Sequence, residues 1–178
     1  MKKMIIVLLL ALVAVTAVFA GQKASLSVLP YSFQSVREVG TENYVNSTYG
    51  LGGKAKYINF KDGSPFYIAF EAGSVSFWAE EKSNFTTVYA LAKAGYSYEL
   101  KDYVSLYAEA GCGADLQIYD KNGSFTSIYA AELGAEFAAT DKLCIAVSCE
   151  GLFAFAEKDN ANYNNWTICP SVGVVYSF

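Results

Sequence analysis

The chain has 178 residues, of which 17% are charged and 16% are aromatic, and its formal net charge at pH 7 is -4. Because no basic cluster occurs along the chain, the composition lacks the electrostatic footprint of a nucleic-acid-binding protein. The complete absence of histidine removes the Ser-His-Asp and Cys-His catalytic arrangements and the usual zinc sites. We therefore expect no nucleic-acid partner, no enzyme activity, no metal and no cofactor.

The first twenty residues have the features of a secretory signal peptide. Two lysines precede an apolar run from Met4 to Val18, and the small residue Ala20 stands at the expected cleavage site. The apolar run is about 15 residues long, which is shorter than the roughly 20 that a membrane-spanning helix needs. We expect residues 1–20 to be removed and residues 21–178 to form a single domain. The alternative is an N-terminal anchor helix.

The rest of the chain repeats with a period of about 40 residues. Three short polar turns, at 61–64, 101–102 and 140–142, alternate with four longer polar loops. Each turn is followed by a similar run of alternating apolar and polar residues. This spacing predicts successive antiparallel hairpins, with longer loops at 37–47, 79–84, 120–124 and 157–165. The eight predicted strands are 24–36, 48–60, 65–78, 85–100, 103–119, 125–139, 143–156 and 166–178.

The two faces of these strands differ in polarity and in side-chain size. In the fifth strand the face with Leu106 and Leu116 is apolar, whereas the opposite face carries Glu109, Gly111 and Gly113. An eight-stranded barrel is just wide enough for packed side chains, so small residues belong inside. Polar residues inside and apolar residues outside indicate a membrane barrel. A soluble barrel, with the faces reversed, is the alternative. In the first strand the alternation changes phase, which predicts a bulge at Pro30.

The last strand ends in VGVVYSF, with its larger side chains on one face. Together with the signal peptide and the repeated hairpins, this ending resembles the small eight-stranded bacterial outer-membrane barrels of the OmpA/OmpX type. The resemblance implies an all-β, eight-stranded antiparallel up-and-down transmembrane β-barrel in the outer membrane, surrounded by lipid, with termini in the periplasm. It also implies a terminal signal that the barrel-assembly machinery recognises, carried here by Val172, Val174, Tyr176 and Phe178.

The polar face of the predicted barrel carries charges on several strands. Folding each hairpin about its turn places Lys54 opposite Glu71, Glu71 opposite Lys93, and Lys93 opposite Glu109. The same arithmetic places Glu132 opposite Glu150, with Glu136 near Glu109 and with Lys56 and Arg37 as the remaining nearby cations. Two interpretations of this interior charge belt are open: a cation path or proton-sensitive site, and a hydrogen-bonded plug. Its residues are Lys54, Glu71, Lys93, Glu109, Glu132, Glu136 and Glu150.

Four cysteines in a secreted chain raise the question of disulfides. Cys112 and Cys149 face outward two strands apart, which exceeds the distance that a disulfide spans. Cys144 and Cys169 face inward on neighbouring strands but are displaced along them. We therefore predict four free thiols.

Three functional hypotheses follow from this arrangement. The first is a structural or surface-interaction barrel with a charge-plugged lumen, whose four outward loops bind an extracellular ligand. The second is a porin-like narrow channel or transporter for small or hydrophobic solutes. The third and weakest is a lipid-modifying enzyme, because known barrels of that kind resemble this architecture but depend on histidine.

Overall fold

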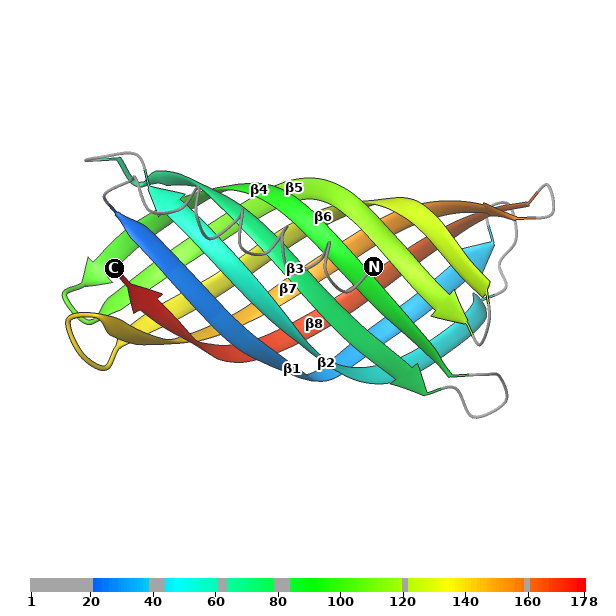
Figure 1. Cartoon of the computed structure of the whole chain (residues 1–178), viewed down its shortest axis with the longest axis horizontal. Coiled ribbons are helices and arrows are strands. Elements are labelled where there is room, and N and C mark those ends of the chain that lie inside the picture. The colour runs from blue at the N-terminus through cyan, green and yellow to red at the C-terminus, as the bar shows by residue number, and fades with distance from the viewer. Residues whose placement is uncertain (1–20, 39–43, 61–63, 79–83, 120–121, 159–160) are drawn as a thin grey trace, which may run out of the picture.

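The computed structural model describes residues 21–38, 44–60, 64–78, 84–119, 122–158 and 161–178. Eight antiparallel strands form a closed barrel in which each strand pairs with its neighbours in sequence and β1 pairs with β8 (Figure 1). The predicted fold class is confirmed, whereas the predicted signal peptide lies outside the described residues. The strands are β1 (Gln22–Glu38), β2 (Tyr44–Phe60), β3 (Phe66–Trp78), β4 (Phe85–Lys101), β5 (Val104–Tyr119), β6 (Asn122–Ala138), β7 (Leu143–Lys158) and β8 (Ala161–Ser177).

Each strand has 13 to 17 residues, more than the roughly 9–11 that a tilted strand needs to cross the hydrocarbon layer. The prediction of four long loops is wrong in extent, because most of 37–47, 120–124 and 157–165 continues as strand. These segments are rich in Asn, Ser and Tyr, so their polarity indicated loops. A strand that extends past the lipid lies in water and needs no apolar face. The described residues contain no helix long and apolar enough to cross a membrane.

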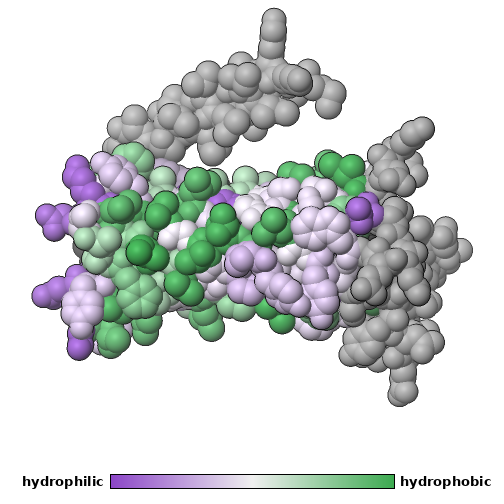
Figure 2. Space-filling model, turned by 90° about the horizontal axis from the view of Figure 1, so that it is seen from below, coloured by the Kyte–Doolittle hydropathy of each residue, from purple (hydrophilic) through white to green (hydrophobic). Residues whose placement is uncertain are grey.

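The outer wall of the barrel is apolar and the inner wall carries the charges. Inward and outward positions alternate along the strands as predicted, and thirty large apolar side chains of the described residues are exposed. Figure 2 shows, on one face of the barrel, a broad apolar band with hydrophilic residues at the end that carries the short turns. Exposed aromatics lie toward both ends of the band, as expected of interfacial girdles, among them Phe66, Tyr96, Tyr176 and Phe178 at one end and Tyr49, Trp78, Tyr129 and Phe155 at the other.

The barrel closes between β1 and β8, where Leu26 pairs with Val174 and Ala24 with Tyr176. The predicted bulge in β1 is confirmed, because the register with β2 shifts between Leu29 and Ser32. Leu29 and Ser32 are both buried, whereas the two residues between them are both exposed. Proline lacks the N–H that a regular ladder requires, so Pro30 occupies the position where pairing is interrupted.

The lumen is less polar than the alternation predicted. A cluster of buried apolar residues fills the half of the lumen away from the termini, and Ile58, Tyr67 and Ala69 form a smaller one near the short turns. In the middle of β4, Tyr89 and Leu91 point inward, whereas the alanines at 90, 92 and 94 point outward. Apolar side chains are accepted there because a narrow lumen filled with side chains holds little water. The larger cluster consists of Leu29, Val75, Phe77, Phe85, Tyr89, Leu91, Ile128, Ala130, Leu152 and Cys169.

All four cysteines are free thiols in the structure. Cys112 and Cys149 are exposed on the outer wall, whereas Cys169 is buried in the lumen and Cys144 is half-buried. Because Cys144 pairs with Val175, it lies six residues along the ladder from Cys169, too far for a disulfide.

We expect a maleimide reagent to modify Cys112 and Cys149 in the folded, detergent-solubilised protein and to leave Cys169 unmodified. Unfolding the protein without reductant should make all four thiols reactive, as counted by mass spectrometry. A count of two in the unfolded protein would reveal a disulfide and overturn the register of β5 to β8.

Candidate functional site

Seven charged side chains from six neighbouring strands meet in the middle of the lumen. Each stands at an inward position of its strand, and each is at most 5% exposed. We call this group the ionic cluster. It contains Lys54 and Lys56 of β2, Glu71 of β3, Lys93 of β4, Glu109 of β5, Glu132 of β6 and Glu150 of β7.

Lys93 lies at the centre of the ionic cluster. Its Nζ is 2.9 Å from a carboxylate oxygen of Glu71, 2.8 Å from one of Glu132 and 3.7 Å from one of Glu109. It also forms an ion pair with Glu150. One ammonium group therefore contacts all four carboxylates of the cluster, across the lumen as well as along its wall.

Lys54 and Lys56 complete the cluster from β2. Lys54 lies 3.0 Å from both Glu132 and Glu150. Lys56 lies 2.7 Å from Glu109 and 2.8 Å from Glu132. The cluster thus has one more carboxylate than ammonium groups, and its charges are neutralised almost entirely within the protein.

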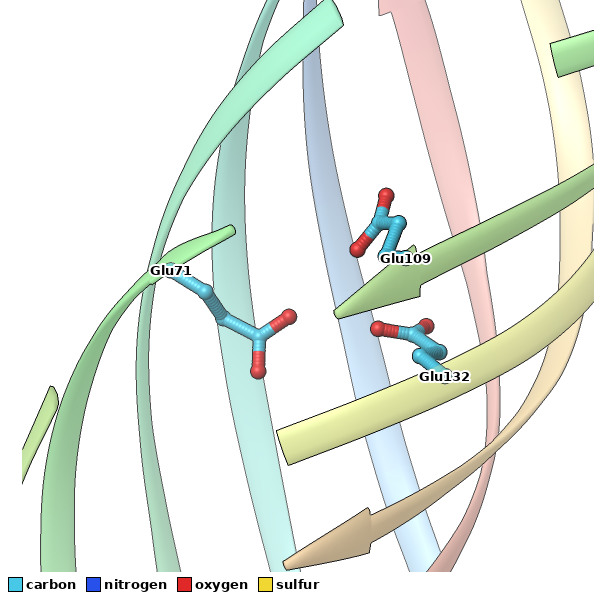
Figure 3. Close-up of side chains that lie close together, drawn as sticks. All are labelled: Glu71, Glu109 and Glu132. Atoms are coloured by element: carbon cyan, nitrogen blue, oxygen red, sulfur yellow. The ribbon is translucent and has the colours of Figure 1, made fainter. Parts of the chain in front are cut away.

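The carboxylates also accept hydrogen bonds from hydroxyl groups. Tyr67 donates to Glu109 at 2.8 Å, and Ser148 and Tyr107 donate to Glu132 at 2.7 Å and 3.2 Å. Figure 3 shows Glu71, Glu109 and Glu132 directed toward one another, with carboxylate oxygens of the three within 4.8 Å. Such a spacing would suit a cation, but here the lysine ammonium groups already lie among these carboxylates.

The predicted register between strands is wrong by two residues in three hairpins. Lys56, not Lys54, faces Glu71, while Leu91 faces Glu71 and Gly95 faces Glu109. The expected partners nevertheless meet, because Lys54 lies 3.4 Å from Glu71 and Lys93 contacts both Glu71 and Glu109. A shift of two residues moves a side chain along its strand but keeps it on the same face, and long side chains span the difference.

Glu132 does face Glu150, as the hairpin arithmetic predicts. Lys56, which the sequence offered as a nearby cation, contacts Glu132 at 2.8 Å. Lys54 and Lys93 also reach both carboxylates, which the hairpin arithmetic did not predict. Pairing within hairpins gave no information on contacts across the lumen. The side chain of Arg37, another cation considered for this region, lies outside the described residues.

Glu136 lies apart from the ionic cluster. It faces Ser105 rather than lying near Glu109, and it forms an ion pair of 2.6 Å with Lys23. The pair borders a cavity of about 440 Å³ at the end with the short turns. Sequence reasoning missed Lys23 because it is the third residue after the predicted cleavage site and lies just before the predicted start of the first strand.

The arrangement can close the lumen. The seven side chains are desolvated, and moving any one of them would leave opposite charges unpaired in a medium of low dielectric constant. The larger apolar cluster lies next to them on the side away from the termini. In the described part of the chain, an ion crossing the barrel would have to displace both the ionic cluster and the larger apolar cluster, which we call the ionic and apolar layers.

The predicted assembly signal lies on the outer wall of β8. Val172, Val174, Tyr176 and Phe178 are all exposed, and Phe178 donates its backbone N–H to the Gln22 carbonyl oxygen at 3.1 Å. Both ends of the barrel domain therefore lie at the same rim. Recognition of these residues by the assembly machinery stays a prediction.

Comparisons with known proteins agree with this architecture. No curated protein matches the sequence. Among solved structures, Neisserial surface protein A has a TM-score of 0.71 at 14% identity, covering 88% of this chain and 97% of its own. The outer membrane protein OprG from Pseudomonas aeruginosa has a TM-score of 0.50 at 10% identity, covering 90% and 98%. These identities show a shared fold alone.

The match to a family model is broader, because it runs from residue 5 to residue 178. That family indicates a place in the bacterial outer membrane, in agreement with the apolar outer wall. The chain belongs to the family described as outer membrane protein beta-barrel domain.

Proposed function

We propose that this protein is a non-enzymatic outer-membrane barrel whose lumen is closed by the ionic cluster and whose outward hairpins take part in surface interactions. The observation that carries the proposal is the contact of Lys93 with all four carboxylates of the cluster. A barrel that conducts ions needs mobile charges beside water, whereas these charges are buried and paired with one another. The lack of histidine supports the non-enzymatic role.

The proposed orientation places the short turns and both ends of the barrel domain in the periplasm. The hairpins β1–β2, β3–β4, β5–β6 and β7–β8 then extend outward from the lipid. Because several of these strands continue beyond the apolar band, the surface available to an extracellular ligand is largely the wall of extended hairpins. An exposed aromatic side chain such as Phe125 is suited to such contacts.

A narrow channel or transporter for small or hydrophobic solutes is the second candidate. The observation that favours it is the open cavity of about 440 Å³ beside Lys23 and Glu136, which admits water to one end of the lumen. The apolar and ionic layers beyond that cavity favour the closed barrel.

Planar lipid bilayers containing the purified protein should show no stable conductance, because the ionic and apolar layers block the lumen. Lys93→Ala and Glu71→Ala proteins, checked for folding by heat-modifiable electrophoretic mobility, would be recorded in parallel. A stable wild-type conductance that either substitution abolishes would reject the closed barrel and favour the channel.

A further inference from the structure

A buried carboxylate outside the ionic cluster lies in the half of the lumen away from the termini. Asp115 of β5 is 3% exposed and points inward. It accepts hydrogen bonds from the hydroxyl of Thr87 and, at 3.0 Å, from the side-chain amide of Gln117. None of the ion pairs between described residues involves Asp115, since the buried lysines all pair with glutamates. A buried carboxylate without an opposite charge is costly, so this position calls for a compensating group.

Asp115 lines a small cavity together with a second buried oxygen acceptor, which lacks a hydrogen-bond partner among the described residues. The cavity has a volume of about 10 Å³, close to the space that one water-sized species occupies. Asn165 of β8, which is 7% exposed, lines the same cavity. Its side-chain oxygen is buried and has no hydrogen-bond partner among the described residues. Two buried oxygen acceptors, from different sides of the barrel, therefore border one enclosed space.

The remaining polar residues around this cavity also supply oxygen atoms. Thr87, Thr167 and Gln34 complete its polar lining, and Gln34 donates a hydrogen bond of 3.4 Å to the Thr167 hydroxyl. No cysteine lines the cavity. Carboxylate, amide and hydroxyl oxygens are ligands for hard cations, whereas soft metals prefer sulfur and nitrogen.

This cavity is separate from the ionic cluster. On β4 the inward residues Tyr89 and Leu91 stand between Thr87 and Lys93, and both belong to the apolar cluster. On β5 two inward glycines stand between Asp115 and Glu109. The lysines of the ionic cluster therefore cannot serve as the counter-charge of Asp115.

The ladder between β6 and β7 ends beside this cavity. Strands β6 and β7 are paired only as far as Ile128 and Ala154, and both of these residues line the cavity. Beyond them β6 continues to Asn122 and β7 to Lys158 without pairing to each other. The cavity thus lies at the point where the pairing between the two strands ends.

We propose that this cavity binds one dehydrated monovalent cation, either an inorganic ion such as sodium or potassium or the primary ammonium group of a small ligand. The single carboxylate of Asp115 matches a single positive charge, whereas divalent sites usually combine several carboxylates. The cation supplies the missing partner of Asp115, and the Asn165 side-chain oxygen serves as one of its ligands.

The test is thermal unfolding of the folded, detergent-solubilised protein in sodium, potassium, methylammonium, calcium or choline chloride at constant ionic strength. Choline is too large for the cavity and serves as the reference. We expect a saturable rise in Tm of about 2–4 °C with at least one of the small monovalent cations. Asp115→Asn should abolish the rise and Asn165→Ala should weaken it, whereas Glu99→Gln, at an exposed carboxylate, should retain it.

Sodium-23 NMR relaxation of the wild-type protein, with potassium and methylammonium as competitors, gives a second readout that does not depend on a variant folding. A bound sodium signal that these competitors displace supports the site. Whether potassium or methylammonium displaces sodium at the lower concentration distinguishes an inorganic ion from an ammonium group. The proposal is overturned if no small monovalent cation raises Tm above the choline value or if the rise persists in Asp115→Asn. It is likewise overturned if calcium alone produces the rise.

Discussion

Replacing Lys93 with methionine is expected to lower the free energy of unfolding by about 3–5 kcal/mol, the usual range when one member of a buried ion pair is removed. Methionine nearly preserves the volume of the side chain, so the loss reports on charge rather than on a cavity. Without Lys93, four buried carboxylates would share the ammonium groups of Lys54 and Lys56. Urea unfolding in lipid vesicles, followed by tryptophan fluorescence, measures the change.

The matched control is Lys101→Met at the exposed end of β4, where the ammonium group lies 5.7 Å from the centre of the Tyr103 ring. We expect that substitution to change stability by less than about 1 kcal/mol. Adding Glu150→Gln to Lys93→Met removes one charge of each sign, so the double variant should be more stable than the sum of the single losses implies. Equal losses for Lys93→Met and Lys101→Met would show that the ionic cluster contributes nothing to stability.

Gly113→Ala is expected to destabilise the barrel by about 1–3 kcal/mol, whereas Gly151→Ala should be neutral or stabilising by up to about 1 kcal/mol. Gly113 faces inward on β5, where an added Cβ would overlap the Ala90 carbonyl oxygen and lie 2.9 Å from the Leu91 Cα. Both atoms belong to the backbone of β4, so a rotamer change cannot relieve the overlap. Gly151 faces outward on β7, and its added Cβ would meet only the Ala131 carbonyl oxygen, at 3.9 Å.

The same urea unfolding measurement applies to both glycine variants, with the folded fraction checked by heat-modifiable mobility. The comparison is informative because the two substitutions add the same methyl group to the same kind of strand. If both variants lost the same stability, the cause would be a general effect on strand backbone rather than the close approach of β4 and β5.

Much of the fold could be predicted because the environment of each side chain depends on whether its residue stands at an odd or an even position along the strand. A strand places alternate residues on opposite faces, so the apolar run of Val172, Val174 and Tyr176 was enough to assign the outer wall of β8. The change of phase around Pro30 likewise located the bulge in β1. The strand ends were harder to predict, since the polar segments 120–124 and 157–165 have the composition of loops and the geometry of strands beyond the lipid.

The register and the contents of the lumen could not be predicted in the same way. A register slip of one residue exchanges the two faces of a strand, whereas a slip of two preserves them and leaves no trace in the alternation. The pairing of Lys56 with Glu71 therefore could not be distinguished from that of Lys54 with Glu71. The inward placement of apolar residues such as Phe77 and Tyr89 could not be predicted either, because alternation alone does not report how much water the lumen holds.

The sequence by itself determined that this protein is an eight-stranded membrane barrel with charges inside, because a two-residue period and the polarity of each face are local properties. Only the tertiary structure decided which charges meet. Lys93 reaches Glu132 and Glu150 through the lumen because the curvature of the closed sheet brings inward side chains of β4 within reach of those of β6 and β7. Asp115 and Asn165 share a cavity for the same reason, since no hairpin connects β5 to β8. Contacts between strands that are not neighbours exist only once the barrel has closed.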